Sequence, residues 1–285
     1  MQHLLGVSII TATFNSIFLK KAKIGDDSLI FNFNILSSLL WCVILFLLSK
    51  CTVTINALTL LWGIAYGLVQ ASFVLFKTLA LRSGPVSITT LIGNSSLLLS
   101  ISVSALLWKE NITLIQCIGV ALLIFSIILC TYKKSESVFK VNWKIYSFFF
   151  AVFSGLVGIT FKAFSKSGNT EYTNDMMIVS AITMTACYFL ISIKNNGLKP
   201  FFNPKNKQNF AFYALITGLL SCAYNRLNIT LSGKIDSIIF FPLFNGGVIL
   251  LSCVLGFVLC GEKLTLKQTS GIITGCVALC IIGIF

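Results

Sequence analysis

Long, continuous blocks of apolar residues, separated by short polar connections, run along the whole 285-residue chain. Each block holds roughly 17 to 25 residues, the length at which a helix crosses a hydrocarbon core of about 30 Å. The blocks lack the polar–apolar alternation of barrel strands, and backbone amides inside a bilayer must bond within their own segment. The pattern therefore predicts helices at 3–19, 29–49, 56–80, 86–108, 113–132, 143–165, 173–193, 208–231, 236–260 and 264–284.

Composition supports a lipid environment. The chain is 56% hydrophobic and 10% charged, whereas a soluble domain carries about 25% charged residues to wet its surface. The formal charge of +13 is spread over short loops and forms no basic helix, so we expect no nucleic-acid partner. The expected partner of these loops is the lipid bilayer, and the plasma (inner) membrane is the expected location.

The side chains offer little for metal, redox or enzymatic chemistry. All ten cysteines except Cys51 lie in apolar segments without a CxxC motif, and the one histidine is His3. Buried cysteines of this kind behave as small hydrophobic residues. The eight acidic residues all fall in loops or within about a turn of a predicted helix end. We therefore expect no metal site, no cofactor, no enzymatic activity and no proton antiport through a carboxylate at the membrane midplane.

The chain contains an internal repeat. Segments 109–119 and 261–271 share five residue types at an offset of 152, and two further identities follow at an offset of 151. The matched pairs are Glu110/Glu262, Thr113/Thr265, Leu114/Leu266, Gln116/Gln268, Gly119/Gly271, Asn94/Asn245 and Gly67/Gly218. We expect two copies of one unit, residues 1–135 and 136–285.

Each copy holds five predicted helices, and an odd number forces the second copy to enter the membrane from the opposite side. The expected fold class is thus an all-α integral membrane protein of ten transmembrane helices, built as two inverted five-helix repeats. Secondary transporters use this architecture to place a central site between two alternately open faces.

The repeated segment resembles a known family. Residues 261–271 fit Gly-Glu-x-Leu-Thr-x-x-Gln-x-x-Gly, although the first copy has Lys109 in place of the leading glycine, and Ala80-Leu81 fits a pair expected before the fourth helix. In these residues the chain resembles the EamA-type, ten-helix branch of the drug/metabolite transporter superfamily. The resemblance implies a permease for a small polar molecule, with the third and eighth helices lining a central cavity.

Polar residues on those helices give a candidate substrate site. Ser221, Asn225 and Asn228 lie on one face of the eighth helix, and the offset of 151 maps this stripe onto Gln70 and Lys77 of the third helix. The expected substrate-binding residues are Gln70, Lys77, Thr90, Asn94, Ser221, Asn225, Arg226, Asn228 and Asn245. With Lys77 and Arg226, such a cavity would favour an anionic or amino-acid-like substrate. Two alternatives stay open: the cations extend toward lipid headgroups, and the amides only join helices.

The expected function is secondary transport of a small polar metabolite by alternating access. The alternative is a membrane-embedded lipid-modifying or scaffold protein without transport activity. Pro242 and the following Asn245-Gly246-Gly247 also suggest a bend in the ninth predicted helix. Lys and Arg number 14 on the side of the loops after odd-numbered helices and 5 on the other, which predicts that both termini face outside.

Overall fold

A computed structural model describes residues 2–22, 24, 27–50, 52–109, 113–131, 141–196, 207–260 and 265–284. The described part of the chain is helical and contains no strand, which confirms the predicted all-α class. Its elements are α1 (Gln2–Lys21), α2 (Asp27–Leu48), α3 (Ala57–Ser83), α4 (Val86–Asn94), α5 (Leu97–Trp108), α6 (Leu114–Thr131), α7 (Val141–Lys166), η1 (Thr170–Tyr172), α8 (Thr173–Asn196), α9 (Lys207–Ser232), α10 (Ser237–Cys260) and α11 (Leu266–Ile284).

One predicted helix is interrupted. The range 86–108 contains two helices, α4 and α5, separated at Ser95–Ser96. The Ser95 amide bonds to the Ile92 carbonyl in a tightened turn, and the Ser100 amide bonds to the Ser96 carbonyl as the helix resumes. By contrast, α10 stays helical through Pro242 and Asn245.

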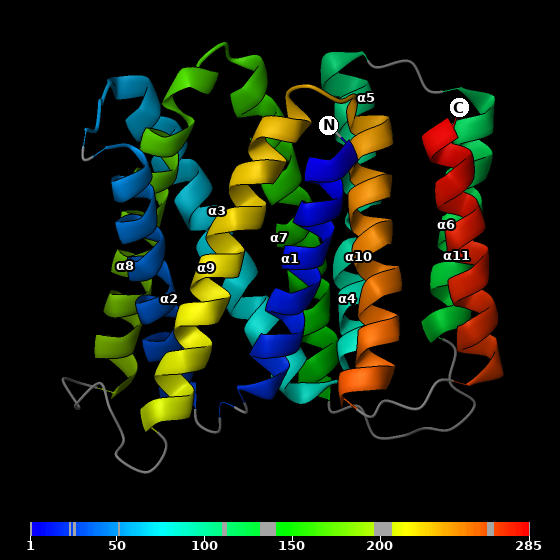
Figure 1. The fold of residues 1–285 in the computed structure, drawn as a ribbon, viewed down its shortest axis with the longest axis horizontal. Helices are drawn as coiled ribbons and strands as arrows, with labels where there is room; N and C mark the ends of the chain where they lie inside the picture. Colours follow the sequence, from blue (N-terminus) through cyan, green and yellow to red (C-terminus); the bar gives the residue numbers. More distant parts are fainter. Residues whose placement is uncertain are drawn as a thin grey trace.

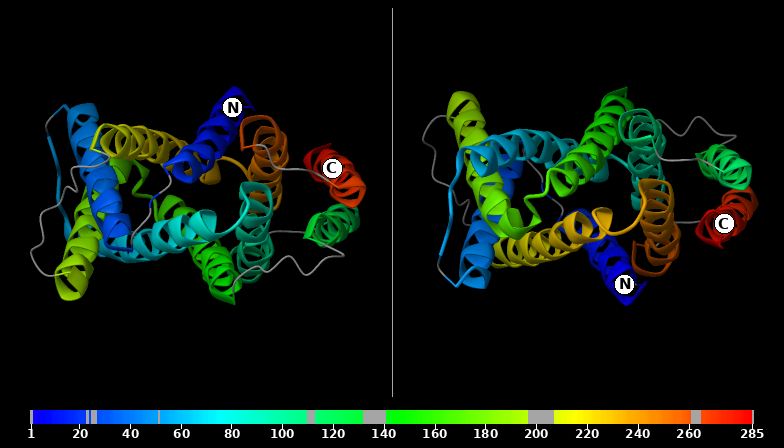
Figure 2. Two further views of the ribbon diagram at one scale, coloured as in Figure 1. Left: turned by 90° about the horizontal axis from the view of Figure 1, so that it is seen from below. Right: turned by 90° about the horizontal axis from the view of Figure 1, so that it is seen from above.

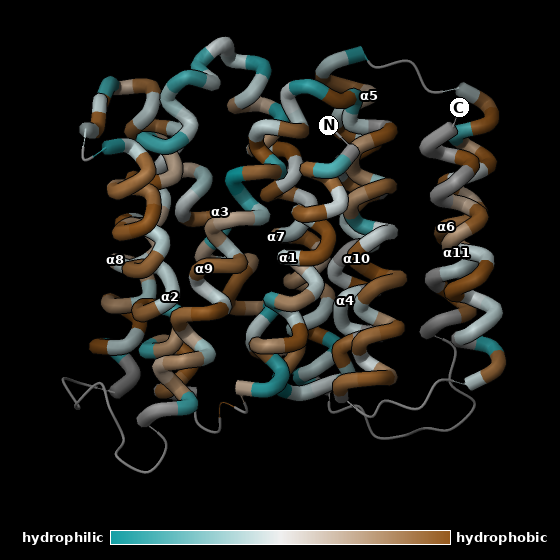
Figure 3. Tube along the Cα trace, viewed as in Figure 1, coloured by the Kyte–Doolittle hydropathy of each residue, from teal (hydrophilic) through white to brown (hydrophobic). Residues whose placement is uncertain are grey.

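Within the described ranges, six helices are long and apolar enough to cross a membrane: His3–Lys21, Leu29–Leu48, Ala57–Ser83, Asn142–Lys166, Thr170–Lys194 and Ile239–Leu259. Large apolar side chains also lie on the outer surface, where Leu106 is 79% exposed and Phe148 is 62% exposed. Hydrophobic residues dominate the middle of the helices, and hydrophilic ones gather toward the helix ends (Figure 3). A water-soluble monomer rarely shows so much apolar surface, so this exterior suits lipid.

The helices stand side by side in an elongated arrangement (Figures 1 and 2). The pair α2 and α8 forms one end, and the pair α6 and α11 forms the other. Between them, α3 packs on α7 and α8, while α9 packs on α1 and α2. The two chain termini lie at the same end of the bundle (Figure 1).

Two glycines allow the central helices to approach their neighbours closely. A methyl group at Gly67 of α3 would lie 2.9 Å from the Ser180 carbonyl oxygen of α8. A methyl group at Gly218 of α9 would lie 2.9 Å from the Ser37 carbonyl oxygen of α2. Small residues of this kind permit close packing of membrane helices, and here they hold α3 and α9 in position.

Candidate functional site

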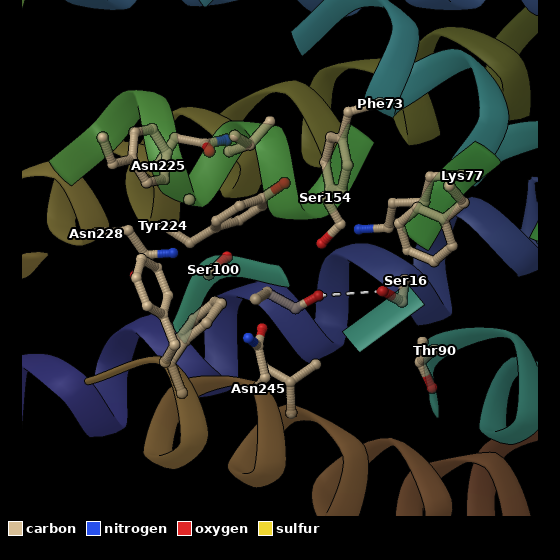
Figure 4. A pocket seen from close by; sticks show the side chains of 18 of the residues that line it. Ser16, Phe73, Lys77, Thr90, Ser100, Ser154, Tyr224, Asn225, Asn228 and Asn245 are labelled. Atoms are coloured by element: carbon tan, nitrogen blue, oxygen red, sulfur yellow. Dashed lines mark hydrogen bonds between the residues drawn. The ribbon is translucent and has the colours of Figure 1, made fainter. Parts of the chain in front are cut away.

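A cavity lies in the middle of the bundle, and side chains from α1, α3, α4, α5, α7, α9 and α10 line it (Figure 4). Its volume is about 640 Å³, including the solvent open to it. Its polar lining is Ser16, Lys77, Thr90, Ser100, Ser154, Asn225, Asn228 and Asn245. Its aromatic lining is Phe73, Phe150, Phe161, Tyr224, Phe240, Phe241 and Phe244. A largely apolar wall with a few polar groups is typical of a small-molecule site.

Lys77 supplies a positive charge to the cavity. The residue is 5% exposed, and its Nζ donates a 2.7 Å hydrogen bond to Asn15 Oδ1. Nζ also lies 5.8 Å from the centre of the Phe73 ring and 5.7 Å from that of Tyr224. Among the residues that the structure describes, none of those lining the cavity is acidic. The cavity therefore has a positive potential.

Asn15 of α1 holds this ammonium in place. While Asn15 Oδ1 accepts from Lys77, Nδ2 donates to the Thr217 carbonyl at 2.9 Å and to Ser221 Oγ at 2.8 Å. These three bonds use both ends of the amide and fix its orientation. Ser221, predicted as a substrate contact, instead lies outside the lining and anchors Asn15 to α9.

The two α9 asparagines of the predicted stripe both reach the cavity. Asn225 is held at both ends of its amide, since Nδ2 donates to the Ser221 carbonyl at 2.8 Å and Oδ1 accepts from Tyr66 at 3.3 Å. Asn228 is held at one end only, where Oδ1 accepts from Ser8 Oγ at 2.6 Å. Asn225 is therefore a fixed part of the wall, whereas Asn228 keeps amide hydrogens for a ligand.

Thr90 and Asn245, also predicted, line the cavity as well. The Thr90 hydroxyl donates to the Val86 carbonyl of its own helix at 2.7 Å. Asn245 is buried, and its side-chain amide bonds to no other described residue. Its donor and acceptor atoms are thus available to a molecule in the cavity.

The structure places two other predicted residues outside the cavity lining and does not describe the side chain of a third. Gln70 is fully buried but is not part of the lining, and neither atom of its amide has a partner among the described residues. Arg226 is exposed and does not line the cavity, because its Nε donates to Asn174 Oδ1 of α8 at 2.9 Å. Asn94 ends α4, and its side chain is outside the described part.

Sequence reasoning missed the aromatic wall. Phe73 precedes Lys77 by four residues, and Phe241 precedes Asn245 by four, so each pair shares one helix face. This spacing was the sequence feature that could have placed these phenylalanines beside the predicted polar residues. A phenylalanine in a membrane helix is equally suited to lipid, however, and the spacing does not distinguish the two environments.

Comparisons with known proteins inform the fold only. No protein-family model matches the chain, and no curated protein matches it. One protein of known crystal structure is similar over 96% of this chain and 97% of its own, with a TM-score of 0.67 and 12% sequence identity. At this identity the similarity shows a shared helical arrangement and carries no information about substrate or activity.

Proposed function

We propose that this chain is a secondary transporter that carries a small polar metabolite across the plasma (inner) membrane by alternating access. The observation that carries the proposal is a cavity that holds the Lys77 cation and several polar side chains, at the centre of a bundle whose exterior is apolar. Charged groups are costly inside a membrane, and they commonly face a pathway for solutes. In this proposal the chain is a member of the EamA-type drug/metabolite transporters, as its repeated segment suggests.

The packing of Gly67 and Gly218 supports two repeats, residues 1–135 and 136–285. These glycines, 151 residues apart, make equivalent approaches to a carbonyl oxygen of the other half. In the same way α3 lies on α7 and α8, as α9 lies on α1 and α2. In Figure 1, α3 and α9 run in opposite directions, as an inverted repeat requires. We count α4 and α5 as one interrupted span, which gives ten spans in all.

The repeat accounts for the position of the cavity. Its lining comes from α1, α3, α4 and α5 of the first unit and from α7, α9 and α10 of the second. A substrate bound there contacts both units, so rocking one unit against the other would expose it to each side of the membrane in turn. With 14 of the basic residues on one side, we place that side in the cytoplasm and both termini outside.

Uptake by proteoliposomes tests the proposal. We expect saturable flux of at least one member of a panel of small carboxylates, amino acids, sugars and amines. Lys77→Met should lower that flux at least roughly tenfold, because it removes a hydrogen bond to a charged group. Arg226→Gln is the matched control, since it removes an exposed cation from a neighbouring helix, and its flux should match the parent. Folded protein without saturable flux for any panel member would contradict the proposal.

A further inference from the structure

The Lys77 ammonium has more N–H donors than there are described acceptor atoms within hydrogen-bond distance of it. A lysine ammonium carries three N–H donors, and Lys77 makes one hydrogen bond, to Asn15. Its remaining neighbours within cation–π distance are the Phe73 and Tyr224 rings, which accept a cation only weakly. A buried charge of this kind is costly unless a partner of opposite charge joins it. A carboxylate of the ligand would satisfy both free donors.

Two asparagines face the same cavity with free N–H donors. Asn228 Nδ2 donates to no described residue, and Asn245 bonds to none with its side chain. Figure 4 shows the Lys77 amine and the amide of Asn228 on opposite sides of the cavity, with Asn245 between them. These amides are neutral, so they suit an uncharged polar group such as a hydroxyl or a carbonyl.

The repeat relates the charged position to a neutral one. The offset that relates Gly67 to Gly218 also relates Lys77 to Asn228. Equivalent positions of the two units thus hold an ammonium on α3 and an amide on α9. The cavity therefore has a positively charged end at α3 and a neutral polar end at α9. A ligand that fits it carries its negative charge toward α3 and a neutral group toward α9.

The wall between these groups is aromatic, and the described part of the cavity lacks a site for a second cation. Phenylalanine rings of α3, α7 and α10 form most of this wall. Flat apolar groups pack well on such rings. A ligand ammonium would meet the charge of Lys77 without a lining carboxylate to pair with it.

We infer that the substrate is a small organic anion with one carboxylate, an apolar or aromatic body, a second uncharged polar group and no ammonium group. The inference rests on the proposed function, because it names the substrate class of the same cavity. The carboxylate binds Lys77, the body lies against the phenylalanines, and the uncharged group bonds to Asn228 and Asn245. Amino acids, which are zwitterions, bind less tightly than the corresponding anions.

Four compounds that share one ring test the inference by equilibrium binding to the purified full chain. They are 3-(4-hydroxyphenyl)propionate, L-tyrosine, tyramine and 3-phenylpropionate. We expect the hydroxylated anion to bind most tightly. L-tyrosine and tyramine should bind at least roughly tenfold more weakly, because the former adds an ammonium and the latter also lacks the carboxylate. 3-Phenylpropionate should bind about threefold to tenfold more weakly, which is the range for one neutral hydrogen bond.

Three variants assign these differences to residues, and a fourth serves as the control. Lys77→Met should abolish the preference for the anion over tyramine, whereas Lys77→Arg, which keeps the charge, should retain it. Asn228→Leu should remove the advantage of the hydroxylated anion and leave 3-phenylpropionate unchanged. Arg226→Gln should reproduce the parent values. The unfolding temperature of each variant shows that a lost preference does not reflect a lost fold.

The outcomes separate the inference from the proposed function. Equal or tighter binding of L-tyrosine or tyramine, no saturable binding of any of the four, or an unchanged order in Lys77→Met overturns the inference. If the expected order appears but proteoliposomes carry none of the bound anions, the site inference stands and transport fails. Saturable flux with a different order of preference supports transport and overturns the inference.

Discussion

The ammonium of Lys77 and the side-chain oxygen of Asn15 are joined by a 2.7 Å hydrogen bond at the wall of the cavity. The same Asn15 side chain bonds to the Thr217 carbonyl and to Ser221 of α9. One amide therefore connects the charged group of α3 to a helix of the other proposed unit. An anion bound to the two free donors of Lys77 would thus be connected through Asn15 to both α1 and α9.

Asn15→Asp should block anion binding. The new carboxylate lies next to Lys77 and neutralises it in place of a ligand, as an internal competitor would. We expect the affinity for 3-(4-hydroxyphenyl)propionate to fall at least roughly tenfold, measured by calorimetric titration. Asn142→Asp makes the same chemical change on the exposed surface of α7 and should leave the affinity unaltered. Unchanged affinity in Asn15→Asp would contradict this account of the site.

Lys77→Met should not weaken the fold appreciably. The substitution removes a buried charge that no described carboxylate balances, and this gain offsets the loss of the bond to Asn15. We expect thermal unfolding of the ligand-free protein at or above the parental temperature. Lys166→Met, which removes an exposed cation of α7, serves as the reference. A loss of more than about 3 kcal/mol would instead identify Lys77 as a structural residue.

Gly67→Ala and Gly218→Ala should destabilise the protein by similar amounts. Each new methyl group would lie 2.9 Å from a backbone oxygen of the neighbouring helix, which cannot move as a side chain can. Overpacking of this kind costs about 1–3 kcal/mol, seen as a lower midpoint of unfolding in denaturant. Gly6→Ala is the control, because nothing lies within 4 Å of its added methyl group. A large effect at one of the two glycines only would argue against equivalent repeats.

Gly275→Val should loosen the pairing of α6 and α11. A first added carbon would already lie 2.7 Å from Ser126 Oγ, which donates a hydrogen bond to the Gly271 carbonyl. We expect a cysteine pair that cross-links these helices in the parent to react more slowly in the variant. Equal cross-linking would show that the close approach at Gly275 does not stabilise the pair.

The positions of the helices were predictable because bilayer thickness sets the length of an apolar run. The interruption at Ser95–Ser96 was not, since serine pairs also occur in continuous membrane helices. At the site, the stripe on α9 correctly placed Asn225 and Asn228 on the cavity. The same helical periodicity excludes Arg226 from the cavity-facing stripe, because it follows Asn225 by one residue and therefore points about 100° away. The connections made by Asn15 depend on three helices meeting, which no local pattern reports.

The interruption between α4 and α5 has no counterpart in α10, although both elements line the cavity. A segment with a break bends at that point, whereas an unbroken helix moves as a rigid rod. In the proposed alternating-access cycle, opening toward one side of the membrane would therefore differ in stiffness from opening toward the other, even if the two units descend from one ancestor. Backbone amides near Ser96 should accordingly exchange with solvent deuterium faster than those near Gly247.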